Sequence, residues 1–249
     1  MDIKNIPEHE LARLREKAKE LSGSTTDYQS EYSSLLTRRV NHEPLQYIEE
    51  YVPFYSISLK VDERCLIPRP ETEYLVEIIK DNIESPKKVL DVGTGSGCIA
   101  LMMKSIFPNS EVTGIDISED AIELANENSK LNSLEVSFFQ SNLLENVKET
   151  DHDLIVANLP YIPTENLNEL DREVIDYEPL TALNGGKDGL EIISNLIHEL
   201  EEKDYKKVNL FLEIDSRKSS ETLELLNSWD EVKLLEDLAE KDRYVFAKR

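Results

Sequence analysis

From Lys88 onward, segments with a strand-like pattern alternate with segments of helical periodicity, and few folds are compatible with that order. Short apolar runs rich in β-formers predict strands, and longer amphipathic stretches between them predict helices. Because parallel strands require crossover connections of this kind, the order predicts an α/β fold with helices on both faces of a parallel sheet. The predicted strands are 89–92, 111–116, 136–140, 154–158 and 208–214, and the predicted helices are 98–105, 119–131 and 190–202.

The C-terminal part of the chain departs from this alternation. Segments 232–238 and 243–248 follow each other closely with no helical pattern between them. Such spacing predicts an antiparallel strand pair. Added to the five preceding strands, the pair would complete a sheet of seven strands.

The N-terminal part predicts a small helical unit. Leu11, Leu14, Ala18 and Leu21 fall on one helical face, and Gly23 follows as a stop signal. A second apolar face recurs at Tyr28, Tyr32, Leu35, Leu36 and Val40. We therefore expect three parts: a short helical domain at 1–43, a β-hairpin linker at 44–67 and the main domain at 68–249.

Charge and composition restrict the possible partners. The chain has 28 Lys and Arg against 51 Asp and Glu, a formal net charge of -23. Proteins that bind nucleic acid gain affinity from an excess of cationic side chains, so we expect no direct nucleic-acid contact. Two cysteines, Cys65 and Cys98, are too few for a disulfide framework or a zinc cluster, and no metal is expected. The charged N-terminus lacks a signal-peptide pattern and no apolar run could span a membrane, so we expect a cytoplasmic monomer.

A glycine-rich turn follows the first predicted strand of the main domain. Gly93, Gly95 and Gly97 allow a sharp turn and a close backbone approach to a ligand, although a generic strand-to-helix turn has the same pattern. Asp116 ends the next predicted strand, where a carboxylate can accept both hydroxyls of a ribose; it could instead cap the helix that starts near Ser118. Since the chain lacks a phosphate-binding motif, the pair of features favours S-adenosylmethionine as the ligand.

The segment Asn158-Leu159-Pro160-Tyr161 arrives where an apolar strand pattern stops. At a strand end beside the glycine turn, the Asn158 side-chain oxygen and the Leu159 carbonyl could each accept one N–H of a planar NH2 group. Pro160 would stiffen the turn, and Tyr161 could lie against the substrate. This pattern predicts methyl transfer to nitrogen; a simple Asx-turn followed by proline is the alternative.

Several further segments carry a family pattern. They are Pro44-Leu45-Gln46-Tyr47-Ile48, Leu66-Ile67-Pro68-Arg69-Pro70-Glu71-Thr72-Glu73, Asp91-Val92-Gly93-Thr94-Gly95-Ser96-Gly97, Tyr177-Glu178-Pro179 through Asp188-Gly189-Leu190, and Asp242-Arg243. With the tetrad, they resemble the HemK/PrmC family of peptide chain release factor glutamine methyltransferases. The resemblance implies a class I S-adenosylmethionine-dependent methyltransferase fold, a Rossmann-like seven-stranded sheet. It also implies that the protein methylates the glutamine amide of the Gly-Gly-Gln motif in release factors.

The same resemblance assigns roles to individual residues. Asn158, Leu159, Pro160 and Tyr161 would bind the glutamine and carry the catalysis, with Asn158 also beside the donor. Arg69 and Glu71 would shape the substrate pocket, or else form a surface ion pair and a helix N-terminus. The residues expected to bind the donor are Gly93, Thr94, Gly95, Ser96, Gly97, Asp116, Asn142 and Leu143, the last flanking adenine.

The chain differs from the family pattern at four places. Leu159 replaces a proline, Asn142 replaces an aspartate, Glu213-Ile214-Asp215 replaces Glu-Ile-Gly, and the N-terminal unit is short. Three other functions therefore stay open at this point. They are methylation of a glutamine in a ribosomal protein, adenine-N6 methylation of nucleic acid, and donor binding without turnover.

Overall fold

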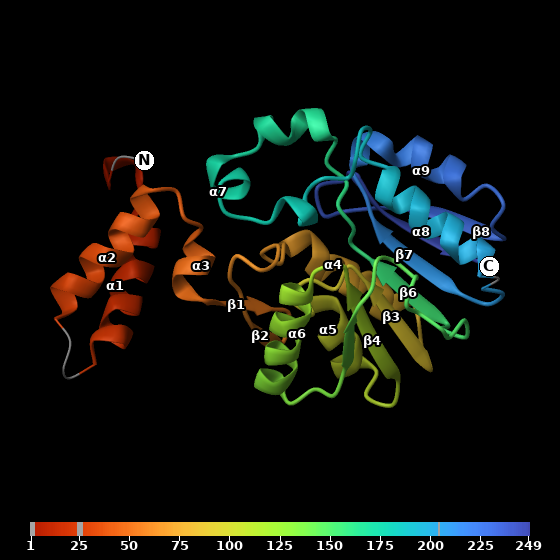
Figure 1. The fold of residues 1–249 in the computed structure, drawn as a ribbon, viewed down its shortest axis with the longest axis horizontal. Coiled ribbons are helices and arrows are strands. Elements are labelled where there is room, and N and C mark those ends of the chain that lie inside the picture. The colour runs from red at the N-terminus through yellow and green to blue at the C-terminus, as the bar shows by residue number, and fades with distance from the viewer. Residues whose placement is uncertain (1–2, 24–26, 204) are drawn as a thin grey trace.

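A computed structural model of the chain describes residues 3–23, 27–203 and 205–249. These residues form a seven-stranded sheet in the order β5-β4-β3-β6-β7-β9-β8, seen in the middle of Figure 1. The strands from β5 to β7 are parallel, and β9 is antiparallel to both of its neighbours. The bounds are β3 Lys88–Val92, β4 Glu111–Asp116, β5 Ser137–Gln140, β6 Leu154–Ala157, β7 Asn209–Glu213, β8 Glu231–Glu236 and β9 Asp242–Lys248. The α/β prediction and the antiparallel C-terminal pair are confirmed.

Alternating side chains of the central strands enter two separate cores. Val89 packs on one face of the sheet with the first core, and Leu90 packs on the other face with the second core. Both residues are fully buried, as are the four residues of β6. Continuous apolar strands are therefore required here, because helices cover both faces.

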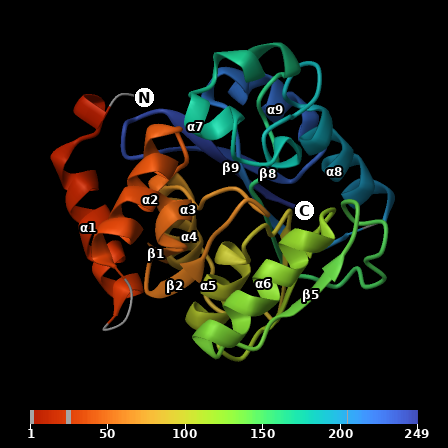
Figure 2. The same ribbon diagram turned by 60° about the vertical axis from the view of Figure 1, so that its left-hand side comes forward.

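Helices α4 (Pro70–Asn82), α5 (Cys98–Ile106) and α6 (Glu119–Asn132) lie on one face, and α8 (Glu191–Glu202) and α9 (Ser219–Leu225) lie on the other (Figures 1 and 2). The strand order changes direction at β3, which has β4 on one side and β6 on the other. In open α/β sheets, ligands bind at the carboxyl ends of the strands beside such a switch point.

The N-terminal region is helical, as predicted. Helices α1 (Glu8–Ser22), α2 (Tyr28–Val40) and α3 (Leu45–Glu49) share a small core, and a 3-10 turn at Ile3–Asn5 precedes them. The core consists of Leu14, Ala18, Leu35, Leu45 and Ile48. On the predicted apolar face of the first helix, Leu14 and Ala18 are buried, as expected, whereas Leu21 is 43% exposed.

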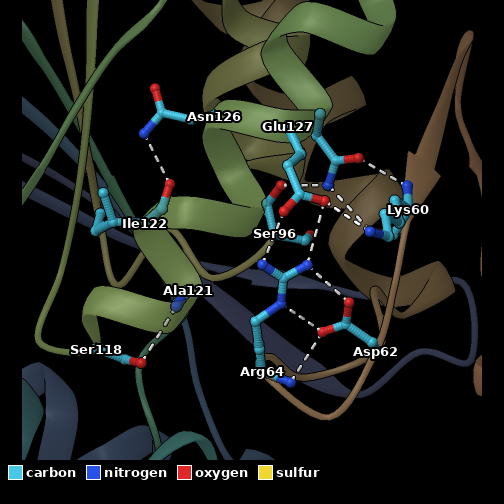
Figure 3. A network of polar contacts seen from close by, with 10 residues as sticks. Lys60, Asp62, Arg64, Ser96, Ser118, Ala121, Ile122, Asn126 and Glu127 are labelled. Carbon is cyan, nitrogen blue, oxygen red and sulfur yellow. Dashed lines mark hydrogen bonds and ion pairs between the residues drawn. The ribbon is translucent and has the colours of Figure 1, made fainter.

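A hairpin of β1 (Tyr51–Phe54) and β2 (Ile57–Lys60) joins the helices to the sheet domain, where the sequence predicts a linker hairpin. The buried Asn128 of α6 fixes this hairpin: its Nδ2 donates to the Lys60 carbonyl at 3.0 Å, and its Oδ1 accepts from the Lys60 amide at 2.7 Å. Nδ2 also donates to the Ser96 carbonyl at 2.9 Å. Figure 3 shows Arg64 between Asp62 and Glu127. Its Nε donates to the Asp62 Oδ1 at 2.8 Å, and its Nη1 donates to the Glu127 Oε1 at 2.9 Å. The chain after the hairpin is thus held against α6 and the glycine turn.

The long connection between β6 and α8 contains only short helical turns. They are η2 (Thr164–Glu169), α7 (Arg172–Ile175) and η3 (Leu180–Ala182); a further turn, η4 (Ser216–Lys218), precedes α9. Arg39 of α2 is buried and pairs with Glu10 at 2.6 Å and with Glu173 of α7 at 2.7 Å. The N-terminal helices are therefore tied to the connection that follows the tetrad. None of the described helices combines the length and apolar composition that a membrane span needs.

Candidate active site

A pocket of about 420 Å³ opens at the carboxyl ends of β3, β4 and β6. Its walls come from the glycine turn, the ends of β4 and β5, the tetrad, the chain after the hairpin and the turn at Leu180–Ala182. The pocket lies at the switch point of the sheet. Features separated by more than a hundred residues in sequence therefore meet in one place.

The glycine turn forms one wall. Gly93, Gly95 and Gly97 have φ values of 74°, 53° and 82°, which other residues adopt only at a cost. The amides of Gly93 and Thr94 both donate to the Ile115 carbonyl at 2.8 Å, so the turn is attached to the end of β4. A Cβ at Gly97 would lie 3.1 Å from the Phe138 ring. Gly93, Thr94, Gly95 and Ser96 line the pocket, and Gly97, which the sequence also predicts to bind the donor, does not.

Asp116 lies at the end of β4 and lines the same pocket. Its two carboxylate oxygens each accept one backbone amide at 2.9 Å, from Gly95 and from Ser118. Each oxygen retains a lone pair for a ligand hydroxyl. The competing role as a helix cap belongs to Ser118, whose hydroxyl accepts from the Ala121 amide at 3.2 Å. Burial raises the pKa of the Asp116 carboxyl.

Two buried side-chain oxygens at the glycine turn, Asp91 Oδ1 and Ser96 Oγ, have no partner in the described part of the chain. Asp91 accepts from the Thr94 hydroxyl at 2.6 Å and from the Ala100 amide at 3.0 Å through Oδ2, while Oδ1 accepts nothing. Burial raises the pKa of Asp91 to about 7. Buried polar atoms are normally hydrogen-bonded. Asp91 is fully buried and does not line the pocket, whereas Asp116 does. Two carboxyl groups at this end of the sheet suit a cationic sulfonium donor better than a phosphate.

Asn142 and Leu143 follow β5 and line the far side of the pocket. Leu143 has a positive φ of 45°, and the Ser141 hydroxyl supports it by donating to the Leu143 carbonyl at 2.7 Å. Asn142 is exposed, with its side chain free to meet a base. Both residues lie where the sequence resemblance expects adenine.

The tetrad follows β6, and three of its residues, Asn158, Leu159 and Pro160, line the pocket. The Asn158 Nδ2 donates to the Thr72 hydroxyl at 3.0 Å, which leaves Oδ1 available as an acceptor. Within the described residues, no backbone amide donates to the Leu159 carbonyl. The Asn158 Oδ1 and the Leu159 carbonyl are thus two unpaired acceptors at the pocket, as a bound NH2 group requires.

The structure places Tyr161 differently from the sequence expectation. Its ring packs against the second core rather than lining the pocket, and burial raises the pKa of its hydroxyl. The pocket wall does not include Tyr161, so its contact with a substrate stays a prediction.

Of the two residues predicted to shape the substrate pocket, Arg69 lines it and Glu71 does not. Arg69 lines the pocket and pairs with Glu178, which is 4% exposed and also accepts from the Ile67 amide at 3.1 Å. Arg69 therefore shapes the wall. Glu71 is exposed and does not line the pocket; only its carbonyl is used, accepting from the Tyr244 hydroxyl at 2.7 Å.

The segment 183–189 supports the tetrad from behind. The Ile162 amide donates to the Leu183 carbonyl at 3.1 Å, and the Gly185 amide donates to the Ile162 carbonyl at 2.9 Å. A Cβ at Gly185 would lie 2.7 Å from the Pro160 carbonyl oxygen, and one at Gly189 would lie 2.4 Å from the Tyr161 carbonyl oxygen. Only glycine allows this close packing of two backbones.

Sequence reasoning missed two contributors. Thr72 lies in the family segment from Leu66 to Glu73, but only the folded chain brings its hydroxyl to Asn158. Leu180 and its neighbours line the pocket from a connection that has no periodic pattern. Cys98 also lines the pocket, and because burial raises its pKa to about 12 the thiol stays neutral. The described residues contain no cluster of three or more His, Cys, Asp or Glu arranged for a metal ion.

Known proteins resemble this chain in sequence and in fold. The model of the methyltransferase small domain family matches residues 70–176. The release factor glutamine methyltransferase of Thermodesulfovibrio yellowstonii is 37% identical over 232 residues, covering 90% of this chain and 83% of that protein. The same-named protein of Lactococcus lactis is 36% identical over 228 residues, covering 90% of this chain and 84% of that one. A methyltransferase structure from Pyrococcus furiosus has a TM-score of 0.59 at 20% identity, covering 87% and 98% of the two chains.

The likeness in structure establishes the class I methyltransferase fold, as predicted, and the long alignments establish the family. The chain belongs to the family of release factor glutamine methyltransferases.

Proposed function

We propose that this protein transfers a methyl group from S-adenosylmethionine to the side-chain amide nitrogen of a glutamine, that of the Gly-Gly-Gln motif in peptide chain release factors. The observation that carries the proposal is the orientation of Asn158 at the pocket. Its Nδ2 is occupied by Thr72, so its oxygen can accept an N–H from a substrate amide. The names of the relatives support the same substrate.

The donor would be held by residues of the first half of the sheet. Asp116 would accept the ribose hydroxyls, the turn from Gly93 to Gly97 would approach the ligand closely, and Asn142 and Leu143 would flank the adenine. The bound donor supplies an electrophilic methyl group on a cationic sulfur. Asp116, which lines the pocket, and the fully buried Asp91 near the glycine turn are compatible with that charge.

The acceptor amide would be held by Asn158 and Leu159. An amide nitrogen is a poor nucleophile because its lone pair is delocalised into the carbonyl group. If the Asn158 Oδ1 and the Leu159 carbonyl each accept one N–H, the nitrogen is held with its lone pair directed at the donor. The same acceptors stabilise the positive charge that develops on the nitrogen, which is an electrostatic contribution.

Leucine in place of proline in the tetrad is compatible with turnover. The Leu159 side chain is 4% exposed and packs in the second core. A Cβ at Gly93 would lie 2.9 Å from the Leu159 Cδ2, so the two residues are in close contact. Burial of this side chain substitutes for the fixed φ of proline in aiming the carbonyl, which argues against donor binding without turnover.

The N-terminal helices, residues 1–43, are proposed to recognise the protein substrate, with residues 44–67 as the linker to the methyltransferase domain at 68–249. Two contacts support this role. Arg39 pairs with Glu173, and the Tyr177 hydroxyl donates to the Asn41 carbonyl at 2.9 Å, so the helices adjoin the connection that follows the tetrad. A monomer acting in the cytoplasm on release factors is consistent with this role.

Transfer of radiolabelled methyl groups tests the proposal directly. The protein is incubated with labelled S-adenosylmethionine and, separately, with purified release factor, ribosomal protein or DNA. We expect label on the release factor, and none on a release factor whose motif glutamine is replaced by alanine. Label on the ribosomal protein or on DNA alone would assign a different acceptor, and donor binding without transfer would show that turnover is absent.

Replacing Gly185 tests whether the tetrad needs its backbone support. Gly185→Ala places a methyl group 2.7 Å from the Pro160 carbonyl oxygen, so the tetrad must shift. We expect kcat to fall about 10-fold, because small displacements of positioning groups are costly. The donor Kd should change by less than about 2-fold, since the substitution does not touch Asp116 or the glycine turn, which are expected to hold the donor. Glu123→Ala, at an exposed position in the middle of α6, is the control. An unchanged kcat in Gly185→Ala would argue against a rigid tetrad.

A further inference from the structure

A chain of buried hydrogen bonds leads away from the tetrad into the protein. The Asn158 Nδ2 donates to the Thr72 Oγ1 at 3.0 Å, and that hydroxyl donates to the Glu213 Oε2 at 2.9 Å. The three residues come from the end of β6, the first turn of α4 and the end of β7. Thr72 and Glu213 are 2% and 3% exposed, so bulk water does not compete for these bonds.

The direction of this chain depends on the charge of Glu213. A carboxylate can only accept, so the Thr72 hydroxyl must donate to it and can then only accept from Asn158. An ionised Glu213 therefore selects the amide orientation in which Asn158 presents its oxygen to the pocket. A protonated Glu213 can donate to Thr72 instead, and the hydroxyl is then free to donate to the oxygen of a flipped Asn158 amide.

We propose that Thr72 and Glu213 are positioning residues that hold the Asn158 carboxamide with its oxygen toward the acceptor nitrogen, and that this orientation requires Glu213 in its ionised form. The inference rests on the proposed function, because it explains how the acceptor group of that reaction is aimed. Neither residue touches the substrate. In the flipped orientation, the NH2 of Asn158 would face the NH2 of the glutamine, and two donors cannot bond.

The surroundings of Glu213 place its titration in the neutral range. Burial raises the pKa of Glu213 to about 7, opposed first by the hydrogen bond from Thr72 and then by the charge of Arg243. Glu71 raises the pKa of Glu213 further, and Tyr161 lowers it. The other titratable groups that interact with Glu213 are Tyr244 on β9 and Cys98 on α5, both kept neutral by their own raised pKa values.

The pH dependence of transfer tests the role of the charge. In single-turnover reactions at saturating donor and release factor, the rate should rise through pH 7 as Glu213 ionises. Glu213→Gln removes the titration but keeps an oxygen that can accept from Thr72. We expect its rate to lie below the parent's rate at pH 8 and to stay level between pH 6 and pH 8. Burial also raises the pKa of Asp91 to about 7, which makes Asp91 the alternative source of such a rise. A rise in rate that persists in Glu213→Gln therefore overturns the proposal.

Thr72 provides a second, independent test. Thr72→Val keeps the shape of the side chain and removes the hydroxyl, so the Asn158 amide loses its anchor and the rate should fall about 10-fold. Thr72→Ser should restore most of it. Thr222→Val is the matched control. Thr222 lies in α9 and is buried like Thr72, but its hydroxyl donates to the Lys218 carbonyl, away from the pocket. A Thr72→Val variant with the parent's rate overturns the proposal.

Thermal unfolding separates failure of this inference from failure of the proposed function. Because the pKa of Glu213 is raised from 4.5 to about 7 in the folded state, the parent loses stability relative to Glu213→Gln as pH rises between these values. The ratio of their folding constants should change by roughly 100-fold over that range. A parent that shows this shift but transfers no methyl group to any glutamine disproves the function and, with it, the positioning role. A parent that methylates release factor without this shift, and without the rise in rate, disproves only the inference.

Discussion

Replacing Asn158 by alanine is expected to slow methyl transfer by about 100-fold or more while leaving donor affinity nearly unchanged. The substitution removes one of the two acceptors that hold the substrate NH2 group, and that acceptor acts mainly as charge develops on the nitrogen. The donor contacts of Asp116 and of the glycine turn remain in place. Single-turnover rates with release factor and the donor Kd from calorimetry measure the two effects separately.

The control for this experiment is Asn209→Ala. Asn209 is the first residue of β7, at the end of the strand opposite to the pocket, and its Nδ2 donates to the Asp153 carbonyl at 2.9 Å. Its replacement should leave the transfer rate within about 2-fold of the parent, because it lies outside the region whose positioning matters. If Asn158→Ala weakens donor binding as much as it slows transfer, Asn158 belongs to the donor site and the assigned role is wrong.

Asp116→Ala should have the opposite profile, with a donor Kd raised about 100-fold. Asp116 is expected to accept both ribose hydroxyls, and a hydrogen bond to a charged group contributes roughly 1.5–3 kcal/mol. Its carboxylate also accepts the Gly95 and Ser118 amides at 2.9 Å, so the variant loosens the turn that faces the ligand. Titration with S-adenosylmethionine and with its product measures the Kd, and kcat at saturating donor should change much less.

Asp116→Asn distinguishes charge from geometry. An asparagine keeps one acceptor oxygen but places an NH2 group where a backbone amide donates and a ribose hydroxyl would donate. We expect a donor Kd between those of the parent and of Asp116→Ala. If either variant binds the donor normally and loses only kcat, Asp116 acts in the chemical step and does not hold the ribose.

Most of the fold follows from local pattern in the sequence. The predicted strand at 89–92 is β3 at Lys88–Val92, and the predicted strand at 111–116 is β4 with the same bounds. These segments are buried on both faces, so their composition carries a strong signal. The connection between β6 and α8 could not be predicted, because its turns at Thr164–Glu169 and Arg172–Ile175 are too short to show a period.

Some of the predicted site residues line the pocket and others do not. The residues on strand ends, such as Asp116 and Asn158, line the pocket, because strand ends at a switch point converge in any sheet of this type. Tyr161 and Glu71 do not line it. Which way a side chain turns after a strand or at a helix start depends on the apolar surface offered by other elements, and adjacent sequence does not encode that surface.

The sequence by itself determined the sheet, the glycine turn and the identity of the groups at its edge, because each of these depends on neighbouring residues and on their periodicity. The tertiary structure decided what those groups do. Asn158 meets Thr72 across 86 positions, and Thr72 meets Glu213 across 141. A single hydrogen bond between distant residues leaves no periodic trace in a sequence, yet it fixes which atom of the Asn158 amide faces the pocket. Only the packing of α4 against the carboxyl ends of β6 and β7 brings those three residues together.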